Sequence, residues 1–167
     1  MKKALVVYYS RTSLTRRIAS EIGRAFDCEI EEIEDVRSRA GAWGFLKSAF
    51  QVLFNMRATI KPIKHDPARF DLVIIGTPIW MGNLALPIRT YVVEHQAAIK
   101  EMAFFCTYGQ GNWQDALRDL RGLTGKWPVA TLAIADSEIT DASHGENLRR
   151  YLGRLSDHAA PRLKATA

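Results

Sequence analysis

Residues 4–26 read ALVVYYSRTSLTRRIASEIGRAF, and this stretch predicts the fold class. Residues 4–9 form a continuous apolar and aromatic run, which is typical of a strand buried on both faces. Apolar residues after residue 15 recur on one face of a helix: Ile18, Ala19, Ile22, Ala25 and Phe26. Between the two, four aliphatic hydroxyl groups stand where the strand gives way to the helix. The stretch therefore predicts a strand, a polar loop and a helix.

The same alternation continues along the chain. Further strands are expected at residues 28–33, 70–78, 102–109 and 128–135, and further helices at 86–95, 113–123 and 146–155. The run CEIEEI at 28–33 alternates acidic and apolar residues, which indicates an edge strand with one wet face. The run FDLVIIGTP at 70–78 is the strongest central strand, and we expect Gly76 and Pro78 to stop it. Alternating strands and helices predict an α/β fold with a parallel sheet covered on both faces, in a single domain of residues 1–167.

Ligands of open parallel sheets bind outside the carboxyl ends of the strands, where the strand order reverses. Three loops are expected there, at residues 10–15, 77–83 and 107–113. Hydroxyl groups, glycines and aromatic rings are concentrated in all three loops, so we take them as the candidate binding site.

The first loop is suited to an anion. A helix N-terminus presents unpaired N–H groups and a partial positive charge, and Ser10, Thr12, Ser13 and Thr15 add O–H donors. Helix capping alone needs one hydroxyl, so four favour a phosphate cradle; capping by Thr12 or Ser13 is the alternative. The loop contains neither GxxxxGK[ST] nor GxGxxG. It also has no acidic cluster of the receiver type and no cysteine nucleophile of the phosphatase type.

Aromatic side chains mark the second and third loops. Trp80 and Met81 lie in TPIWMGN, and Tyr108 and Trp113 lie in TYGQGNW. Flat side chains beside a phosphate site suggest a planar apolar ring joined to that phosphate, with glycines allowing the backbone to approach it. The alternative is that the rings pack the core, above all Trp113, which stands at the start of an expected helix.

With these loops, the chain resembles the flavodoxin family, near the FMN-dependent NAD(P)H:quinone reductase group. VVYYSRTSLTRRIA resembles the phosphate-loop motif of that family, in which Ser10, Thr15 and Ala19 fit and Ser13 replaces the usual Ala, Gly or Cys. IIGTPIWMGNLALPIRTYV and FCTYGQGNW resemble the second and third flavin loops. The resemblance covers nearly the whole chain. It implies a flavodoxin-like three-layer sandwich of the short form, with five parallel strands in the order 2-1-3-4-5.

The resemblance also implies FMN as cofactor and NAD(P)H as a candidate electron donor. It assigns the FMN phosphate to Ser10, Arg11, Thr12, Ser13, Leu14 and Thr15. It places around the flavin ring Pro78, Ile79, Trp80, Met81, Gly82, Asn83, Thr107, Tyr108, Gly109 and Gly111. Phosphate loops of the family usually hold the dianion with neutral groups, so we expect Arg11 to point to solvent or toward an incoming nucleotide.

No catalytic residue and no metal site are predicted. The histidines are dispersed, and Cys28 and Cys106 match no metal-binding spacing, so we expect two unrelated buried thiols. Hydride transfer to a flavin needs stacking and little acid–base help.

Two functions are in competition, with a third kept open. The first is an oxidoreductase that passes electrons from NAD(P)H to a quinone or similar acceptor. The second is an electron carrier that docks to redox protein partners, and the third is an interaction module without flavin. Family carriers are typically acidic, whereas this chain has a net charge of +5 and a pI near 9.4, which favours anionic partners and the oxidoreductase. No nucleic-acid motif accompanies the scattered positive charge.

Residues 36–64 predict a basic, apolar helical segment. Between residues 36 and 70, seven Lys or Arg residues accompany one acid, Asp66. Apolar residues at 41–56 extend almost all round the helix, so we expect a lid over the flavin, an acceptor pocket, a homodimer interface or a contact with a membrane surface. A buried helix with basic flanks is the alternative.

A cytoplasmic location is expected. The apolar run behind MKK ends by Ser10 without a small-residue cleavage site, and no apolar stretch reaches the roughly 18 residues of a transmembrane span.

Overall fold

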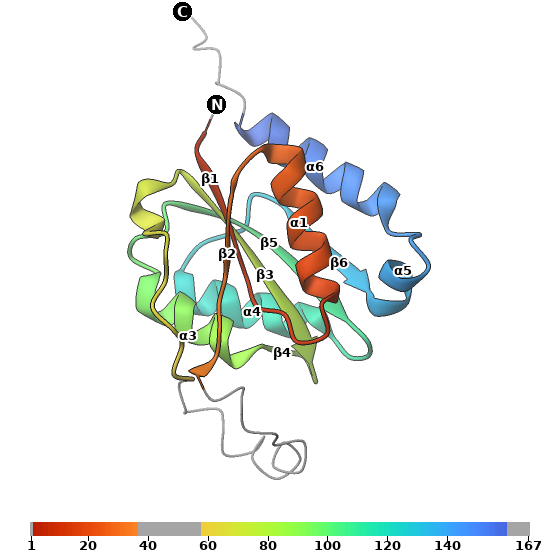
Figure 1. Cartoon of the computed structure of the whole chain (residues 1–167), viewed down its shortest axis with the longest axis horizontal. Coiled ribbons are helices and arrows are strands. Elements are labelled where there is room, and N and C mark those ends of the chain that lie inside the picture. The colour runs from red at the N-terminus through yellow and green to blue at the C-terminus, as the bar shows by residue number, and fades with distance from the viewer. Residues whose placement is uncertain (1, 37–57, 160–167) are drawn as a thin grey trace, which may run out of the picture.

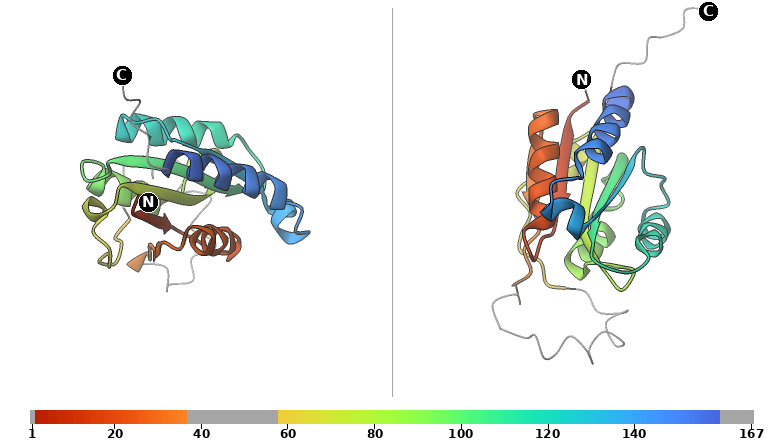
Figure 2. Two further views of the ribbon diagram at one scale, coloured as in Figure 1. Left: turned by 90° about the horizontal axis from the view of Figure 1, so that it is seen from above. Right: turned by 90° about the vertical axis from the view of Figure 1, so that its right-hand side faces the viewer.

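The structure, a computed structural model, describes residues 2–36 and 58–159 (Figure 1). A central sheet separates two layers of helices, as the two further views show (Figure 2). On one face, α1 (Leu14–Phe26) and α6 (Gly145–Ala159) cover the first apolar core. On the other face, α3 (Leu86–His95) and α4 (Trp113–Thr124) cover the second. The fold is thus the expected three-layer α/β sandwich.

Five parallel strands form the sheet: β1 (Ala4–Tyr8), β2 (Glu29–Glu32), β3 (Leu72–Trp80), β5 (Glu101–Tyr108) and β6 (Thr131–Ala135). Their order is β2-β1-β3-β5-β6, and each neighbouring pair is parallel. Counted among parallel strands only, this is the expected order 2-1-3-4-5, which is confirmed. The chain order reverses beside β1, so the carboxyl ends of β1, β3 and β5 form one edge.

Three short elements were not expected from the sequence. β4 (Asn83–Leu84) pairs antiparallel with the end of β3. A 3₁₀ helix, η3 (Pro67–Arg69), precedes β3, and α5 (Asp136–Thr140) follows β6 directly. Each has five residues or fewer, which is too short for a periodic pattern to show.

Gly76 and Pro78 do not stop β3, contrary to expectation. A Cβ atom on Gly76 would lie 2.0 Å from Cζ of Phe105, so the glycine makes room for that ring inside the strand. Tyr8, the last residue of β1, is paired with Gly76. The pairing of β3 with β1 therefore ends before Pro78, so the N–H group that proline lacks costs no hydrogen bond to β1. Pairing with β5 carries the strand on to Trp80.

β2 is an edge strand as expected, but its wet face is not the one expected. Glu31 is only 4% exposed, whereas Ile30 is 37% exposed. The carboxylate of Glu31 accepts the backbone N–H groups of Lys64 and His65 at 3.1 and 3.0 Å. The returning chain therefore covers this face of β2, and its N–H groups offset the cost of burying the charge.

The basic segment at 36–64 is described only at its ends, and residues 37–57 lie outside the described residues. Residues 58–64 are not helical: Ile60 forms an isolated antiparallel bridge with Asp35, and Lys61 donates its backbone N–H to Glu34. The helical expectation is therefore wrong for residues 58–64. Within the described ranges, no helix combines the length and the apolar character needed to cross a membrane.

Candidate functional site

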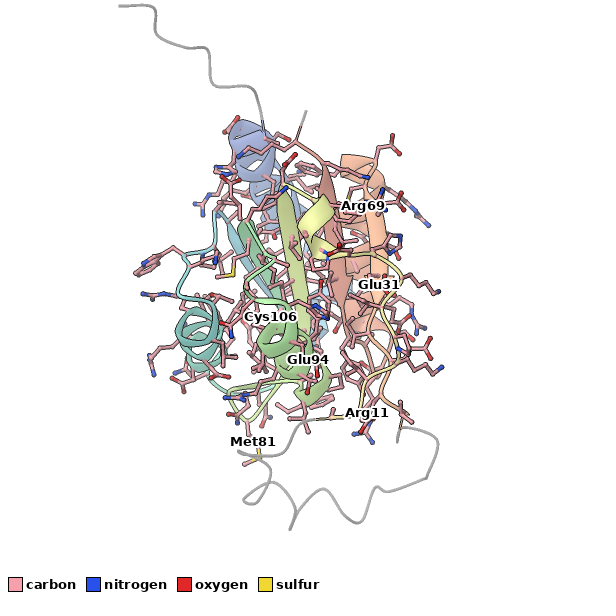
Figure 3. All side chains as sticks on the ribbon, turned by 90° about the vertical axis from the view of Figure 1, so that its left-hand side faces the viewer. Arg11, Glu31, Arg69, Met81, Glu94 and Cys106 are labelled. Atoms are coloured by element: carbon pink, nitrogen blue, oxygen red, sulfur yellow. The ribbon has the colours of Figure 1, made fainter. Side chains whose placement is uncertain are left out.

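The three loops meet at the carboxyl edge of the sheet. The first follows β1, the second follows β3, and the third follows β5. Arg11 of the first loop and Met81 of the second lie at the same end of the molecule (Figure 3). The aromatic rings of Tyr9 and Trp80 contact each other edge to face, with centroids 6.2 Å apart. Tyr9 directly precedes the first loop, so the chain that enters this loop contacts the second loop.

The first loop leads into α1 through a strained residue. Ser13, the N-cap position, has φ of 69°, in the left-handed region that favours glycine, and its side chain makes no capping hydrogen bond. Instead, Oγ of Ser10 accepts the backbone N–H of Arg16 at 3.2 Å. Capping by Ser13 is thus not what holds the helix start. The exposed Thr12 and Ser13 flank an N-terminus that has no acidic residue in its first turn.

Thr15 turns inward rather than toward the loop surface. It is 1% exposed, and its hydroxyl lies 2.8 Å from the hydroxyl of Thr107 at the end of β5. Two residues assigned to different parts of the flavin site from the sequence therefore bond to each other. This buried pair of hydroxyl groups holds the start of α1 against β5.

The two arginines near the loop have different partners. Arg16 donates to Oε1 of Glu32 at 2.6 Å, and the Tyr8 hydroxyl donates to the same carboxylate at 3.0 Å. Burial, followed by the bond to Glu32, raises the pKa of Tyr8 to about 12. Arg11 is exposed, and its guanidinium lies 5.9 Å from the ring centroid of Trp80, within cation–π range. The positive side chain at the mouth of the site is thus Arg11.

The second loop is a two-residue hairpin between β3 and β4. Met81 and Gly82 have φ of 51° and 79°, as in a type I′ turn. The Asn83 amide donates to the carbonyl oxygen of Met81 at 2.9 Å and closes the turn. Met81 is 77% exposed, the highest value among the exposed large hydrophobic residues of the described chain. The tip of the hairpin therefore presents an apolar side chain to solvent.

The third loop packs against this hairpin. Asn112 caps α4, its side chain accepting the backbone N–H of Gln114 at 3.2 Å. A Cβ atom on Gly82 would lie 3.3 Å from the carbonyl oxygen of Asn112, and one on Gly111 would lie 3.6 Å from the Gly82 nitrogen. The positive φ of Gly82 (79°) and Gly111 (108°) favours glycine at both positions, where the two backbones lie close together.

The predicted residues divide into those at the surface of the site and those beneath it. Ile79 is 2% exposed and belongs to the second core, Pro78 is buried, and Leu14 packs against the first core. At or near the surface lie Arg11, Thr12, Ser13, Trp80, Met81, Asn83, Tyr108, Gly109 and Gly111. The sequence pattern placed the three loops at the carboxyl edge of the sheet, but it did not separate the exposed residues of each loop from the buried ones.

Two residues near the site were not predicted. Tyr9 lies under Trp80, and it was counted only as the end of an apolar run. Asp136, at the start of α5, has a carboxylate oxygen 3.3 Å from the place of a Cβ on Gly109, and burial raises its pKa. No sequence pattern indicated Asp136 as a site residue, because it directly follows a strand after which no binding loop was expected.

The two cysteines agree with the expectation of buried thiols in part. Cys106 is fully buried, and burial raises the pKa of its thiol. Cys28 is only partly buried, with a pKa raised to about 11 mainly by desolvation. Among residues 2–36 and 58–159, no group of three or more His, Cys, Asp or Glu side chains is placed to hold a metal ion.

Several solved structures share this fold. A flavoprotein from Lactobacillus acidophilus NCFM, crystallised in complex with FMN, is 24% identical, covers 86% of this chain and 99% of its own, and has a TM-score of 0.62. Oxidised flavodoxin 1 from Bacillus cereus is 16% identical over 93% of this chain and 98% of its own, with a TM-score of 0.56. An NADH:FMN oxidoreductase in its apo form is 16% identical over 92% and 89%, with a TM-score of 0.57.

No protein-family model matches the sequence, and no curated protein matches it. At the identities of the solved structures, the likeness establishes a flavodoxin-like fold, in agreement with the sheet order. Ligand and activity have to be argued from the residues of this chain.

Proposed function

We propose that this chain binds FMN at the carboxyl edge of its sheet and is an oxidoreductase that passes electrons from NAD(P)H to a quinone or a similar acceptor. One observation carries the proposal: Tyr9 and Arg11, at the start of the hydroxyl-rich first loop, lie beside Trp80 of the second loop, which has an exposed apolar tip and packs against the glycine-rich third loop. The FMN complex of the Lactobacillus protein, which has the same fold, supports the choice of cofactor.

The first loop would hold the FMN phosphate. The first hydrogen bond of α1 runs from the N–H of Arg17 to the carbonyl of Ser13, so the N–H groups of Leu14 and Thr15 precede the helical ladder. Positive φ at Ser13 lets successive N–H groups turn toward one point, which is the geometry of an anion nest. Thr12 and the hydroxyl hydrogen of Ser10 would add donors, and Arg11 would add charge at the rim.

The second and third loops would hold the flavin ring. Trp80, Met81 and Tyr108 supply apolar area, while Gly82, Gly109 and Gly111 let the backbone approach the ring edge. Pro78, Ile79 and Thr107 lie beneath these residues and position them, and Asn83 closes the hairpin. When bound, FMN would supply the hydride and electron transfer, and the protein would supply position and electrostatics.

The choice of the electron donor is based on charge. A chain of net charge +5 attracts an anionic dinucleotide and repels basic redox partners. The NADH:FMN oxidoreductase supports this reading, whereas the Bacillus flavodoxin supports the alternative, a non-enzymatic carrier that docks to redox proteins. A homodimer, expected from the basic and apolar sequence at 36–64, is also part of the proposal.

Flavin binding is tested first by titrating the purified chain with FMN and with riboflavin, which lacks the phosphate. The double variant Thr12→Ala/Ser13→Gly removes two hydroxyl donors. It should weaken the binding of FMN by about tenfold or more while leaving the affinity for riboflavin nearly unchanged. Ser20→Ala, a hydroxyl removed from the middle of α1, is the matched control. Equal losses for both ligands would contradict the phosphate assignment.

The reaction is tested by anaerobic mixing of the FMN-loaded protein with NADH or NADPH. Rapid bleaching of the flavin absorbance followed by turnover with a quinone is the expected result. Reduction that requires a second protein would support the carrier instead.

A further inference from the structure

A second concave site lies beside the sheet edge formed by β6. This groove has a volume of about 240 Å³. Its walls include Tyr108 and Trp113 from the third loop, Thr131 from β6, and Asn147, Arg150 and Arg154 from α6. Among the described strands β6 pairs only with β5, so the groove follows the open edge of the sheet. None of the six residues except Tyr108 belongs to the proposed flavin site.

Two guanidinium groups line one wall of the groove. Arg150 and Arg154 are four residues apart on α6, so they project from the same face of the helix. Arg150 pairs with Glu146 at 2.9 Å, but the two side chains are 61% and 75% exposed, and such a surface pair is weak. A phosphate group that binds both guanidinium forks would compete well for Arg150.

Glu138, a carboxylate bonded to Asn147 of the groove, is already engaged by donors. Glu138 accepts the backbone N–H of Ala135 at 2.8 Å with one oxygen, and the side-chain amide of Asn147 at 3.3 Å with the other. These bonds hold Asn147 at the groove and reduce the repulsion that Glu138 would exert on an anion. The charged side chains that line the groove are therefore two cations, with Glu146 as their exposed competitor.

Two aromatic side chains complete the groove. Tyr108 is the last residue of β5 and Trp113 is the first residue of α4, and both are half-buried. Planar rings of this kind stack on a base. Both belong to the third loop, residues 107–113, which also borders the proposed flavin site, so the groove and that site share a wall.

We propose that the groove binds the adenylate portion of the dinucleotide that donates electrons, with Arg150 and Arg154 on its phosphates and Trp113 beside its base. This inference rests on the proposed function, because it assigns the donor of that same flavin. A volume of about 240 Å³ is below the range of about 300–1,000 Å³ that is usual for small-ligand sites, so the groove has room for part of a dinucleotide and not for the whole molecule. The nicotinamide half would extend over the shared third loop.

The test uses ADP as the probe, measured by calorimetry on the full chain. The double variant Arg150→Gln/Arg154→Gln should weaken ADP binding by at least about tenfold. Arg149→Gln, which removes one exposed charge of the same helix outside the groove, should leave ADP binding unchanged. Glu146→Gln should strengthen it, because Arg150 loses its competitor. Undetectable ADP binding to the wild type, or equal affinities of the double variant and Arg149→Gln, would overturn the proposal.

The same variants separate this inference from the proposed function. FMN affinity should be unchanged in Arg150→Gln/Arg154→Gln, while KM for the dinucleotide rises and kcat stays near the wild-type value. ADP binding is measured without flavin as well, so its result decides the groove even if FMN does not bind. Loss of FMN binding in the double variant would overturn the separation of the two sites on which the proposal depends.

Discussion

Met81→Asn should stabilise the flavin-free protein and weaken FMN binding, two effects of opposite sign. Met81 occupies the first central position of the hairpin turn with φ of 51°, where an L-residue with a large side chain costs about 1–2 kcal/mol. Asn followed by Gly is the preferred pair for a type I′ turn. Recovering about 1 kcal/mol in a domain of this size should raise Tm by about 2–4 °C.

The loss of affinity follows from the exposure of the same side chain. Met81 is 77% exposed in the described structure, and complete burial of a methionine contributes about 1.5–3 kcal/mol. If a flavin ring covers half of it, the substitution costs about 1 kcal/mol, or about fivefold in the dissociation constant. We expect the strain to be retained because the apolar tip serves the ligand.

Thermal unfolding followed by circular dichroism measures the first effect, and quenching of FMN fluorescence measures the second. Ala142→Asn is the matched control: Ala142 is also exposed and has φ of 62°, but it lies in the turn between α5 and α6. It should raise Tm to a similar extent without changing FMN affinity. If Met81→Asn left FMN affinity at the wild-type value while Ala142→Asn stabilised as expected, the assignment of the hairpin tip to the flavin would be wrong.

Three further predictions concern residues below and beside the site. Gly76→Ala should destabilise the folded protein by about 1–3 kcal/mol or more, because the new Cβ would lie 2.0 Å from the Phe105 ring. Adding Phe105→Leu to this variant should recover part of the lost stability, as measured by urea unfolding, and no recovery would contradict the overlap. Burial raises the pKa of Asp136, so its protonated form favours folding: that contribution is present below the unfolded pKa near 3.9 and is lost as pH rises through the folded pKa. Asp136→Asn should therefore raise Tm more at pH 7 than at pH 3. An equal rise at both pH values would show that burial of the charged carboxylate is not the reason for the stabilisation. Ser13→Gly should raise the free energy of unfolding by about 1 kcal/mol through relief of positive φ, measured in urea, whereas a loss would show that the Ser13 side chain stabilises the loop.

Local patterns in the sequence were sufficient for the order and type of the main elements. The helix expected at 86–95 has the bounds of α3, and the helix expected to start at Trp113 starts there. Apolar periodicity specifies the buried face of α4, whereas α3 has no clear apolar stripe and its expected start depended on Pro87, which is tolerated in a first helical turn. The carboxyl-edge rule then brought the three loops together without knowledge of any contact.

Contacts between distant segments decided the rest. Phe105 needs the space at Gly76, Thr107 bonds to Thr15, and the returning chain at residues 64–65 supplies donors for Glu31. The partners in each of these pairs are at least 29 residues apart in the chain, so no local window contains the information. Periodicity states that a side chain is buried, whereas its hydrogen-bond partner and the space around it depend on which strand or loop the folded chain places beside it. For the same reason the groove between α4 and α6 was visible only in the tertiary structure, since its two arginines and two aromatic rings come from elements that the sequence leaves unconnected.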